Sequence, residues 1–458
     1  MLKIEFKINF FLSLKNNEYI LYKSMMFKVQ KNKLKLNKGQ YRFWRDMCRR
    51  SKNLFNSTLW QTNQHFEFCG GFLIYPSAYH IMKDTPQYQA LGTDPAQQTM
   101  KVVERCFRSF FGLLKKKQSG NYNKPVKKPN FLPKEGYFLC IFPQRNCTKQ
   151  FSVVVPKDLQ SKYKFKKFVY PLPPNVIGHK VKEVRILPKG RAEHFEIEFV
   201  YEVEQEHPKL DKKQTLSIDP GVNNFATCLD SKTGRSFILD GRKMKSINQW
   251  YNKERARLKS ILELQGKQKS SKRLRAMNAK RELRLNEFLN QYVNLIVQMC
   301  LTQQIGKVVI GEGWHAQNGV RHGDANNQNF VMLPFGKFAW KLKAKCELYG
   351  IEFRTINEAY TSKCDHLVNE PMCYHDEYLG RRIKRGLFKS STGIVFNADV
   401  NGALGIMLKS GSGKSLRTQL SSGVVNTPLR IRLNDIQLNS SKRLALRHFK
   451  SSIQAPTL

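Results

Sequence analysis

Hydrophobic positions recur at helical spacing through the first part of the chain. Residues 25–40 are expected to form a short strand and turn, and residues from Gln40 to about Leu114 to be helical. The apolar positions that carry this prediction are Phe43, Trp44, Met47, Cys48, Leu54 and Phe55. A second helix within the stretch is expected after Asp94-Pro95, a pair that favours a helix start.

The pattern then becomes one of short strands. Strands are predicted at residues 137–142, 151–155, 181–187 and 195–203. The last of them alternates apolar and polar positions, which is typical of a half-buried strand.

From Thr215 onward, strands and helices follow in a defined order. Three short strands are predicted at 216–219, 225–229 and 236–239, then a long helical stretch at 243–302, a strand at 307–310, a helix at 335–349, a strand at 351–356 and a closing helix at 397–408. This is the element order of the RNase H fold. In that fold, strand one is central and strand four lies beside it.

Charge and composition indicate the class of partner. The 458 residues include 79 Lys and Arg against 35 Asp and Glu, which gives a net charge of +44. A hydrophobic fraction of 41% is enough to build cores, so the chain is not a disordered basic tail. Since a folded protein this basic repels itself unless a polyanion neutralises it, nucleic acid is the expected partner.

Two segments combine charge with features suited to nucleic-acid contact. Residues 115–117 and 124–129 form a Lys-rich, proline-broken stretch, which is expected to contact phosphate or to be a solvated linker. Lysines alternate with aromatic residues over 162–168, as in segments that stack on bases, although core aromatics produce the same pattern.

The ten cysteines include no Cys-x-x-Cys pair, so a disulfide framework is not expected. We therefore expect the protein to act in a reducing cytosol. No apolar run approaches the roughly 20 residues of a membrane span. Residues 1–24 are interpreted as a possible upstream extension, with Met25 or Met26 as the true start.

Two aspartates stand in positions suited to metal-dependent chemistry. Asp219 ends the apolar run of strand one and precedes Pro220-Gly221, and Asp399 lies in the first turn of the closing helix. In the RNase H order the end of strand one faces strand four and the last helix. Carboxylates there suit two-metal phosphodiester cleavage, in which hard oxygen ligands select Mg²⁺ or Mn²⁺.

A third carboxylate is expected, and two residues compete for the role. Glu312 follows the strand-four run but is separated from it by Gly311, and a one-residue slip turns a strand side chain to the opposite face. A bulge at Gly311 would restore it. Glu358, at the end of strand five, is the alternative, and the choice stays open.

Four potential zinc ligands follow: Cys364, His366, Cys373 and His375. Zinc is not expected here, because the Cys-x-His spacing is too short for both ligands to wrap one ion comfortably. Arg381–Arg385 forms a basic run before the closing helix and is placed to grip a nucleic-acid strand that enters the site.

Several blocks together resemble TnpB (OrfB) proteins, the RNA-guided RuvC-type endonucleases of bacterial insertion sequences, which are related to type V CRISPR effectors and to eukaryotic Fanzor proteins. The resemblance covers about residues 25–410. It is carried by Ile218–Thr227, Asn327–Phe330, Tyr360–Cys364, Gly380–Lys389 and Asn397–Ala403.

The resemblance implies an α/β fold with a β-barrel, in which an N-terminal wedge β-barrel carries a helical insertion and precedes an RNase H-like (RuvC) nuclease domain. The expected parts are the barrel at 25–40 and 120–210, a helical recognition module at 41–119, the nuclease at 211–408 with a helical insertion at 243–304 and a degenerate zinc-finger region at 361–396, and a polar tail at 409–458. The barrel and helices would hold a guide RNA and read a short motif beside the target DNA, which the nuclease would cut. The resemblance also implies a place of action in the cytoplasm, at the nucleoid.

The chain departs from the common family pattern at two places. Only Cys364 and Cys373 of the usual four zinc-finger cysteines are present, and Gly311 stands where the strand-four glutamate is expected. A subset of TnpB and Fanzor proteins uses a relocated glutamate, which favours Glu358. If neither glutamate serves, the chain is a nuclease-dead RNA-guided DNA-binding protein. A transposase that acts in DNA transposition itself is the less favoured alternative. The oligomeric state is left open.

Overall fold

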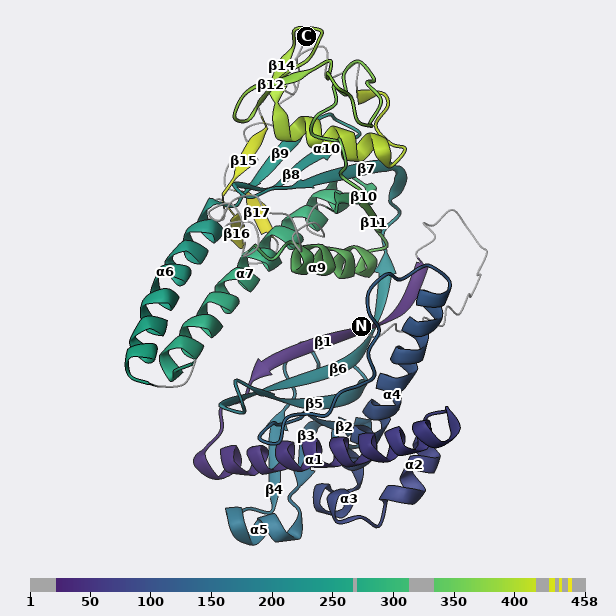
Figure 1. Cartoon of the computed structure of the whole chain (residues 1–458), viewed down its shortest axis with the longest axis vertical. Coiled ribbons are helices and arrows are strands. Elements are labelled where there is room, and N and C mark those ends of the chain that lie inside the picture. Colours follow the sequence, from purple (N-terminus) through teal and green to yellow (C-terminus); the bar gives the residue numbers. More distant parts are fainter. Residues whose placement is uncertain are drawn as a thin grey trace. The chain divides into compact units, whose positions relative to one another are not determined.

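The computed structural model describes residues 22–266, 270–312, 333–416, 428–432, 436–438 and 444–446. The chain divides into two compact units, one formed by residues 24–205 and the other by residues from 206 onward. The two are drawn in Figure 1 and are described separately below. Residues 1–21 of the expected upstream extension and the motif at 327–330 lie outside the described residues.

The first unit contains two β-sheets. Its strands are β1 (Tyr22–Lys33), β2 (Cys140–Pro143), β3 (Gln150–Val154), β4 (Lys167–Pro171), β5 (Val181–Lys189) and β6 (His194–His207). Four of them form a sheet in the order β1-β6-β5-β2, and β3 pairs with β4. The strands expected from the apolar pattern are confirmed, whereas a closed wedge barrel stays a prediction.

Helices pack against these sheets. They are α1 (Lys38–Cys69), α2 (Tyr75–Met82), α3 (Pro86–Leu91), α4 (Thr93–Gln118) and α5 (Lys157–Tyr163), with a 3-10 turn, η1 (Gln144–Asn146). Asn37 and Gln40 form a reciprocal capping box that starts α1. Trp44 on α1 is fully buried and contacts the ring of Phe168 edge-on. For Phe168 the base-stacking interpretation of residues 162–168 is therefore wrong, because this ring belongs to the core.

The second unit is built around a six-stranded sheet. Its strands are β7 (Asp211–Pro220), β8 (Asn224–Asp230), β9 (Ser236–Asp240), β10 (Ile305–Gly311), β11 (Glu352–Ile356) and β15 (Leu429–Ile431). Their order is β11-β10-β7-β8-β9-β15. Strands β7 to β9 form an antiparallel meander, and β10 runs parallel to both β7 and β11. The first strand of this unit is therefore central and the fourth lies beside it, as the element order predicts.

Helices cover both faces of this sheet. They are α6 (Arg242–Leu264), α7 (Lys272–Thr302), α9 (Phe335–Leu348) and α10 (Ala398–Lys409). Figure 1 shows α10 on one side of the sheet and α7 and α9 on the other. Leu216 and Ile218 of β7 belong to the core shared with α7 and α9, whereas Leu229 packs with α10. The predicted long helical stretch at 243–302 is two helices that pack together.

The remaining strands form two small sheets, β12 (Arg381–Lys384), β13 (Leu387–Lys389) and β14 (Val395–Asn397) in one and β16 (Ile436–Leu438) and β17 (Leu444–Leu446) in the other. The expectation of a loosely ordered tail over 409–458 is wrong for Leu429–Ile431. These residues pair in parallel with β9 and extend the central sheet. No helix in the described part of the chain is long and apolar enough to cross a bilayer.

Candidate functional site

Asp219 lies near the end of the central strand, on the face that α10 covers. Its backbone pairs with Thr227 of β8. Because Leu216 and Ile218 point into the core on the other face, strand alternation directs Asp219 toward α10. A Cβ added to Gly402 of α10 would lie 2.8 Å from Asp219 Oδ2, so a glycine at 402 lets the helix approach the carboxylate closely.

Asp399 is positioned by the start of α10. The side chain of Asn397 caps this helix and accepts hydrogen bonds from the backbone N–H groups of Asp399 (2.9 Å) and Val400 (3.3 Å). An acid in the first turn also interacts favourably with the helix dipole. Asp399 Oδ2 accepts a hydrogen bond from Asn224 Nδ2, and Oδ1 lies 3.8 Å from the guanidinium of Arg382.

Glu358 occupies the place beside Asp219 where a strand-four side chain would lie. Ile310 of β10 pairs with Ile218, so Gly311 is next to Asp219 on the same face of the sheet. A Cβ added to Gly311 would lie 2.5 Å from Glu358 Cγ and 2.6 Å from Glu358 Cδ. The absence of a side chain at 311 therefore makes room for Glu358.

Glu312 follows a regular strand. The pairing of β10 with β11 shows no register shift between Lys307 and Gly311, and the N–H of Glu312 donates to the carbonyl of Ile356 at 2.9 Å. The bulge considered at Gly311 is therefore not formed in this stretch. Alternation then directs Glu312 to the face opposite Asp219.

The loop that carries Glu358 is held by several hydrogen bonds. Thr361 donates to the Glu358 carbonyl through its backbone N–H (3.1 Å) and its hydroxyl (2.8 Å). Lys409, at the end of α10, donates to the carbonyls on both sides of Glu358, those of Asn357 (3.1 Å) and Ala359. One helix therefore supplies Asp399 and also fixes the loop of Glu358.

The three carboxylates interact electrostatically. Burial raises the pKa of Asp219 well above its usual range, and the nearby charges of Glu358 and Asp399 raise it further, while Arg382 opposes the shift. Burial and the charge of Asp219 likewise raise the pKa of Cys228 on the next strand. Asp219, Glu358 and Asp399 therefore form one acidic cluster, named the acidic cluster below.

The donor chemistry of the acidic cluster suits a hard divalent cation, since carboxylate oxygens are the ligands that Mg²⁺ and Mn²⁺ prefer. Within the described ranges, no three His, Cys, Asp or Glu side chains are already disposed as ligands of one ion. The acidic cluster therefore has the right oxygen donors but needs side-chain movement to bring them onto a common ion.

Residues 361–396 are organised by buried carboxylates. Asp365 accepts hydrogen bonds from the hydroxyl of Ser390 (2.7 Å) and the N–H of Ser391 (2.8 Å), and Glu370 accepts from the N–H groups of Asp365 and Leu379. Among the four potential zinc ligands, Cys364 and His375 both contact the carbonyl of Pro371, Cys373 lies 3.5 Å from His375, and buried His366 contacts the carbonyl of Thr361.

Basic side chains lie next to the acidic cluster. Strand β12 is exposed along its length. Its Arg382 lies 3.8 Å from Asp399 and also lines a pocket of about 600 Å³. The pocket is lined by Ser362, Lys363, Glu377, Tyr378, Gly380, Arg381, Arg382 and Phe388. This places cationic groups from the predicted Arg381–Arg385 run at the edge of the acidic cluster.

A second concave surface lies between α6 and α7, and is named the hairpin groove. Its volume is about 910 Å³, and it is lined by Lys243, Ser246, Ile247, Trp250, Glu254, Arg273, Ala276, Met277, Lys280, Arg281, Arg284, Glu287 and Phe288. Trp250 is 58% exposed, and Lys243, Lys280 and Arg284 are exposed as well.

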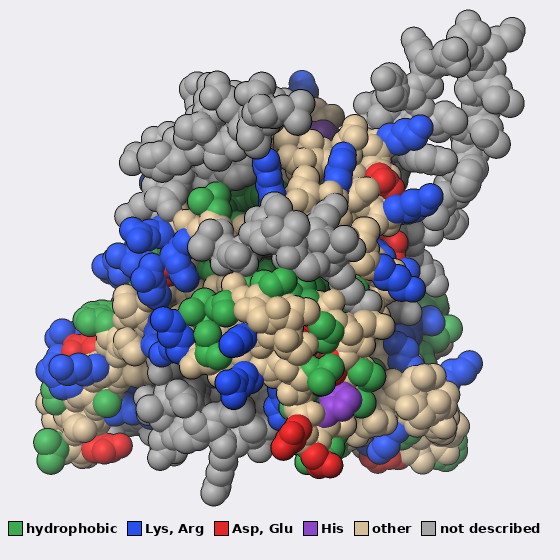
Figure 2. Space-filling model, turned by 90° about the horizontal axis from the view of Figure 1, so that it is seen from above, with side chains coloured by type: hydrophobic (Ala, Val, Ile, Leu, Met, Phe, Trp, Pro, Cys, Tyr) green, Lys and Arg blue, Asp and Glu red, His purple; other side chains and the backbone are tan. Residues whose placement is uncertain are grey.

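The surface of the molecule carries many basic groups. Figure 2 shows one face, on which Lys and Arg side chains are more frequent than acidic ones.

Sequence patterns did not single out three residues that position the acidic cluster: Asn224, Lys409 and Arg430. Asn224 lies in the block Ile218–Thr227, and its short distance in sequence from Asp219 was the one feature that could have indicated a role at the site. Nothing in the sequence pointed to Arg430, whose side chain donates to Asn224 Oδ1 at 2.7 Å.

Two family models match the chain, over residues that lie mostly in the second unit. Residues 198–314 match OrfB_IS605, described as a probable transposase, and residues 335–406 match the Cas12f1-like TNB domain. No curated protein matches the chain.

Among solved structures, a chain in the cryo-EM structure of a Cas12f1–sgRNA–target DNA complex is similar over 81% of this chain and 83% of that chain, with 14% identity and a TM-score of 0.53. A chain of a CRISPR–Cas12f ternary complex matches over 80% and 81%, with 14% identity and a TM-score of 0.32. The first similarity shows a shared fold.

Proposed function

Since the chain belongs to a TnpB-like (OrfB) family related to type V effectors, we propose that it is an RNA-guided DNA endonuclease. It would cut target DNA by metal-dependent phosphodiester hydrolysis at an RNase H-like, RuvC-type site. The first unit would act as the wedge barrel with its helical insertion. The reducing cytoplasm, at the nucleoid, is the proposed place of action.

The observation that carries this proposal is the convergence of three carboxylates from distant parts of the chain. Asp219 lies one residue before the end of the central strand, Asp399 lies in the first turn of α10, and Glu358 fills the space over Gly311. A cluster in which burial and two acids raise the pKa of Asp219 is costly to keep ionised. A role in metal binding and catalysis explains this clustering of acids better than a contribution to folding stability does.

We assign Asp219, Glu358 and Asp399 as the residues that would hold Mg²⁺ or Mn²⁺. When bound, such ions activate a water molecule and neutralise the leaving oxygen. Asn224 holds one oxygen of Asp399 and leaves the other directed toward Arg382. The exposed guanidinium of Arg382 is suited to contact a phosphate of the strand that reaches the acidic cluster.

We further propose that guide RNA and target DNA are the partners. The net charge of +44 favours binding to polyanions through counterion release. The hairpin groove combines an exposed tryptophan with cationic side chains, which suits a single strand with one stacked base. The Cas12f1 chain that shares the fold was solved with sgRNA and target DNA, which supports the same partners here.

The experiment is purification of the chain with its co-expressed RNA, followed by incubation with plasmids that carry a matching target beside randomised flanks. Cleavage that needs the RNA, the matching target and Mg²⁺ supports the proposal. Target binding without cleavage by the wild-type chain would instead support the nuclease-dead binder. Joining of element ends to the target would support direct action in DNA recombination and transposition.

A further inference from the structure

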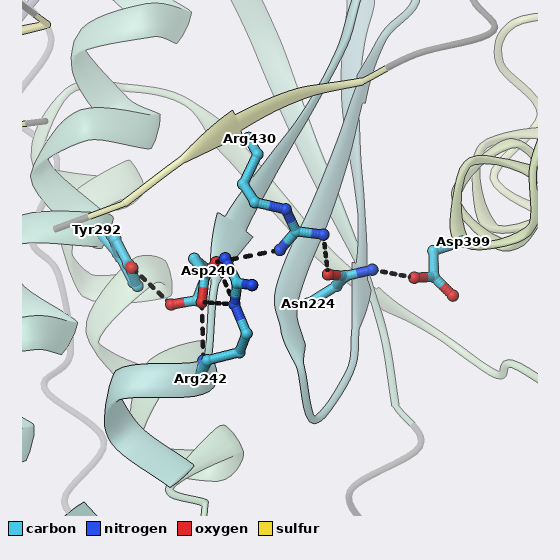
Figure 3. Close-up of polar contacts among 6 residues, drawn as sticks. All are labelled: Asn224, Asp240, Arg242, Tyr292, Asp399 and Arg430. Atoms are coloured by element: carbon cyan, nitrogen blue, oxygen red, sulfur yellow. Dashed lines mark hydrogen bonds and ion pairs between the residues drawn. The ribbon is translucent and has the colours of Figure 1, made fainter. Parts of the chain in front are cut away.

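A chain of polar contacts connects strand β15, at the edge of the central sheet, to Asp399 (Figure 3). Arg430 of β15 donates through Nη2 to Asn224 Oδ1 at 2.7 Å, and its Nη1 lies 3.2 Å from Asp240 Oδ2. Asn224 in turn donates through Nδ2 to Asp399 Oδ2. The contacts span 206 positions of sequence between Arg430 and Asn224.

The Arg430 guanidinium determines which end of the Asn224 amide faces Asp399. An asparagine amide has one accepting and one donating end, whereas arginine only donates. Arg430 can therefore hold only the oxygen end of Asn224, which leaves the N–H₂ group for the carboxylate. With Arg430 removed, the amide is held, among the described residues, only by its contact with Asp399 and is free to rotate away from it.

Arg430 is itself held in place from two directions. Its backbone pairs with Ile238 of β9. Its partner Asp240 pairs with Asn224 across the β8–β9 ladder and is held by Arg242 Nε at 2.8 Å. The hydroxyl of buried Tyr292 donates to the Asp240 carbonyl at 2.7 Å. The network is therefore supported by the sheet and by α7.

We propose that Arg430 is a positioning residue for Asp399 that acts through Asn224, so that strand β15 is a working part of the nuclease site. This inference rests on the proposed endonuclease function for its effect on cleavage. Its geometric content, the orientation of Asn224 and Asp399, is independent of that function.

The activity test is a double-mutant cycle with Arg430→Ala, Asn224→Ala and the double variant, each loaded with RNA. Each single substitution should lower the cleavage rate about 10- to 100-fold, with target binding within about twofold of wild type. The double variant should be no slower than the slower single variant, because both act through one contact. Multiplicative losses would overturn the inference, since they would mean that Arg430 acts by another route, such as docking of β15.

Two further variants keep the test valid if Arg430→Ala folds poorly. Arg430→Lys keeps the charge beside Asp240 but cannot contact both partners with a rigid fork, so it should fold and recover only part of the rate. Leu429→Ala, at an exposed neighbour on the same strand, should cleave like wild type. Full activity in Arg430→Lys together with a loss in Leu429→Ala would contradict the inference.

A structural readout separates failure of this inference from failure of the proposed function. Crystal structures of the wild type and of Arg430→Ala or Arg430→Lys would be compared at Asn224 and Asp399. Loss of the Asn224–Asp399 contact in the variants supports the inference even if the wild-type chain does not cleave. An unchanged contact overturns it even if the chain is an active nuclease.

Discussion

The Glu358 side chain lies in the space that a side chain on Gly311 would fill, with its Cγ and Cδ 2.5 and 2.6 Å from the position of an added Cβ. Gly311 is the residue of β10 that lies beside Asp219. The carboxylate beside Asp219 therefore comes from the loop that follows the neighbouring strand, β11, and not from β10 itself. This relationship favours Glu358 over Glu312 as the third acid.

The two glutamates are expected to respond differently to removal of their charge. Glu358→Gln should lower the cleavage rate by more than about 100-fold, because loss of a direct metal ligand exceeds the 10- to 100-fold cost of losing an outer partner. Glu312→Gln should keep the cleavage rate within about threefold of wild type, because Glu312 lies on the opposite face of the strand and is not a metal ligand. Single-turnover cleavage of a labelled target measures both. The reverse ranking would show that Glu312 reaches the acidic cluster.

A carboxylate moved to position 311 should partly replace Glu358. In the double variant Gly311→Glu/Glu358→Ala, the new side chain at 311 no longer collides with Glu358, and the acid lies on the strand beside Asp219. We expect cleavage faster than that of Glu358→Ala but about 100-fold below wild type, because small errors in position are costly. Gly112→Ala, where an added Cβ meets nothing within 4 Å, is the control for a glycine replacement. No recovery above Glu358→Ala would argue against a shared position.

Asp219 should reduce the stability of the metal-free protein at neutral pH. Its pKa is raised on folding, so its effect is most favourable below the pKa of an unfolded aspartate, and that contribution is lost as the pH rises through the folded-state value. Asp219→Asn should therefore raise the apparent Tm in EDTA at pH 7.5 by about 2–4 °C, which corresponds to roughly 1 kcal/mol. The difference should vanish at acidic pH.

Added Mg²⁺ should stabilise the wild type more than Asp219→Asn, because only the wild type retains the full set of carboxylates. Exposed Asp376 offers a matched control, and Asp376→Asn should show neither effect. A lower Tm for Asp219→Asn in EDTA would contradict the electrostatic description of the acidic cluster.

The hairpin groove should contribute to nucleic-acid affinity. Trp250→Ala should weaken binding of a single-stranded oligonucleotide by about 1–3 kcal/mol, the usual range for one stacked base. Trp340→Ala is the control, since Trp340 is similarly exposed (66%) but lies on α9, outside the groove. Fluorescence anisotropy at fixed salt measures both. Equal affinity for the two variants would remove the groove from the binding surface.

Much of the second unit could be predicted because its strands are short apolar runs that end at turns. Asp219 and Asp399 stood out because each ends or opens such an element. The third acid could not be chosen from sequence, since the choice depends on the register between β10 and β11 and on a side chain that fills the space over a glycine. Neither the strand register nor the filled space over a glycine produces a local pattern in the amino-acid sequence.

Strand β15 was missed for a different reason. Three residues are too few for a period of two to be recognised, and the surrounding polar segment suggests a tail. Its role depends on pairing with β9, more than 190 residues earlier, and on the reach of one arginine. The aromatic residues at 162–168 were ambiguous because stacking platforms and core positions share one composition, and only burial distinguishes them.

The assignment of the acidic cluster as an RNA-guided nuclease site is best tested by cleavage of a target plasmid by the chain with its co-purified RNA, compared with Asp219→Ala and Asp399→Ala. We expect Mg²⁺-dependent cleavage by the wild type at the sequence matched by the RNA, and intact plasmid with both variants, which should still bind the target. Unchanged cleavage by either variant would show that the acidic cluster is not the nuclease site, and cleavage that needs no RNA would show that the chain is not RNA-guided.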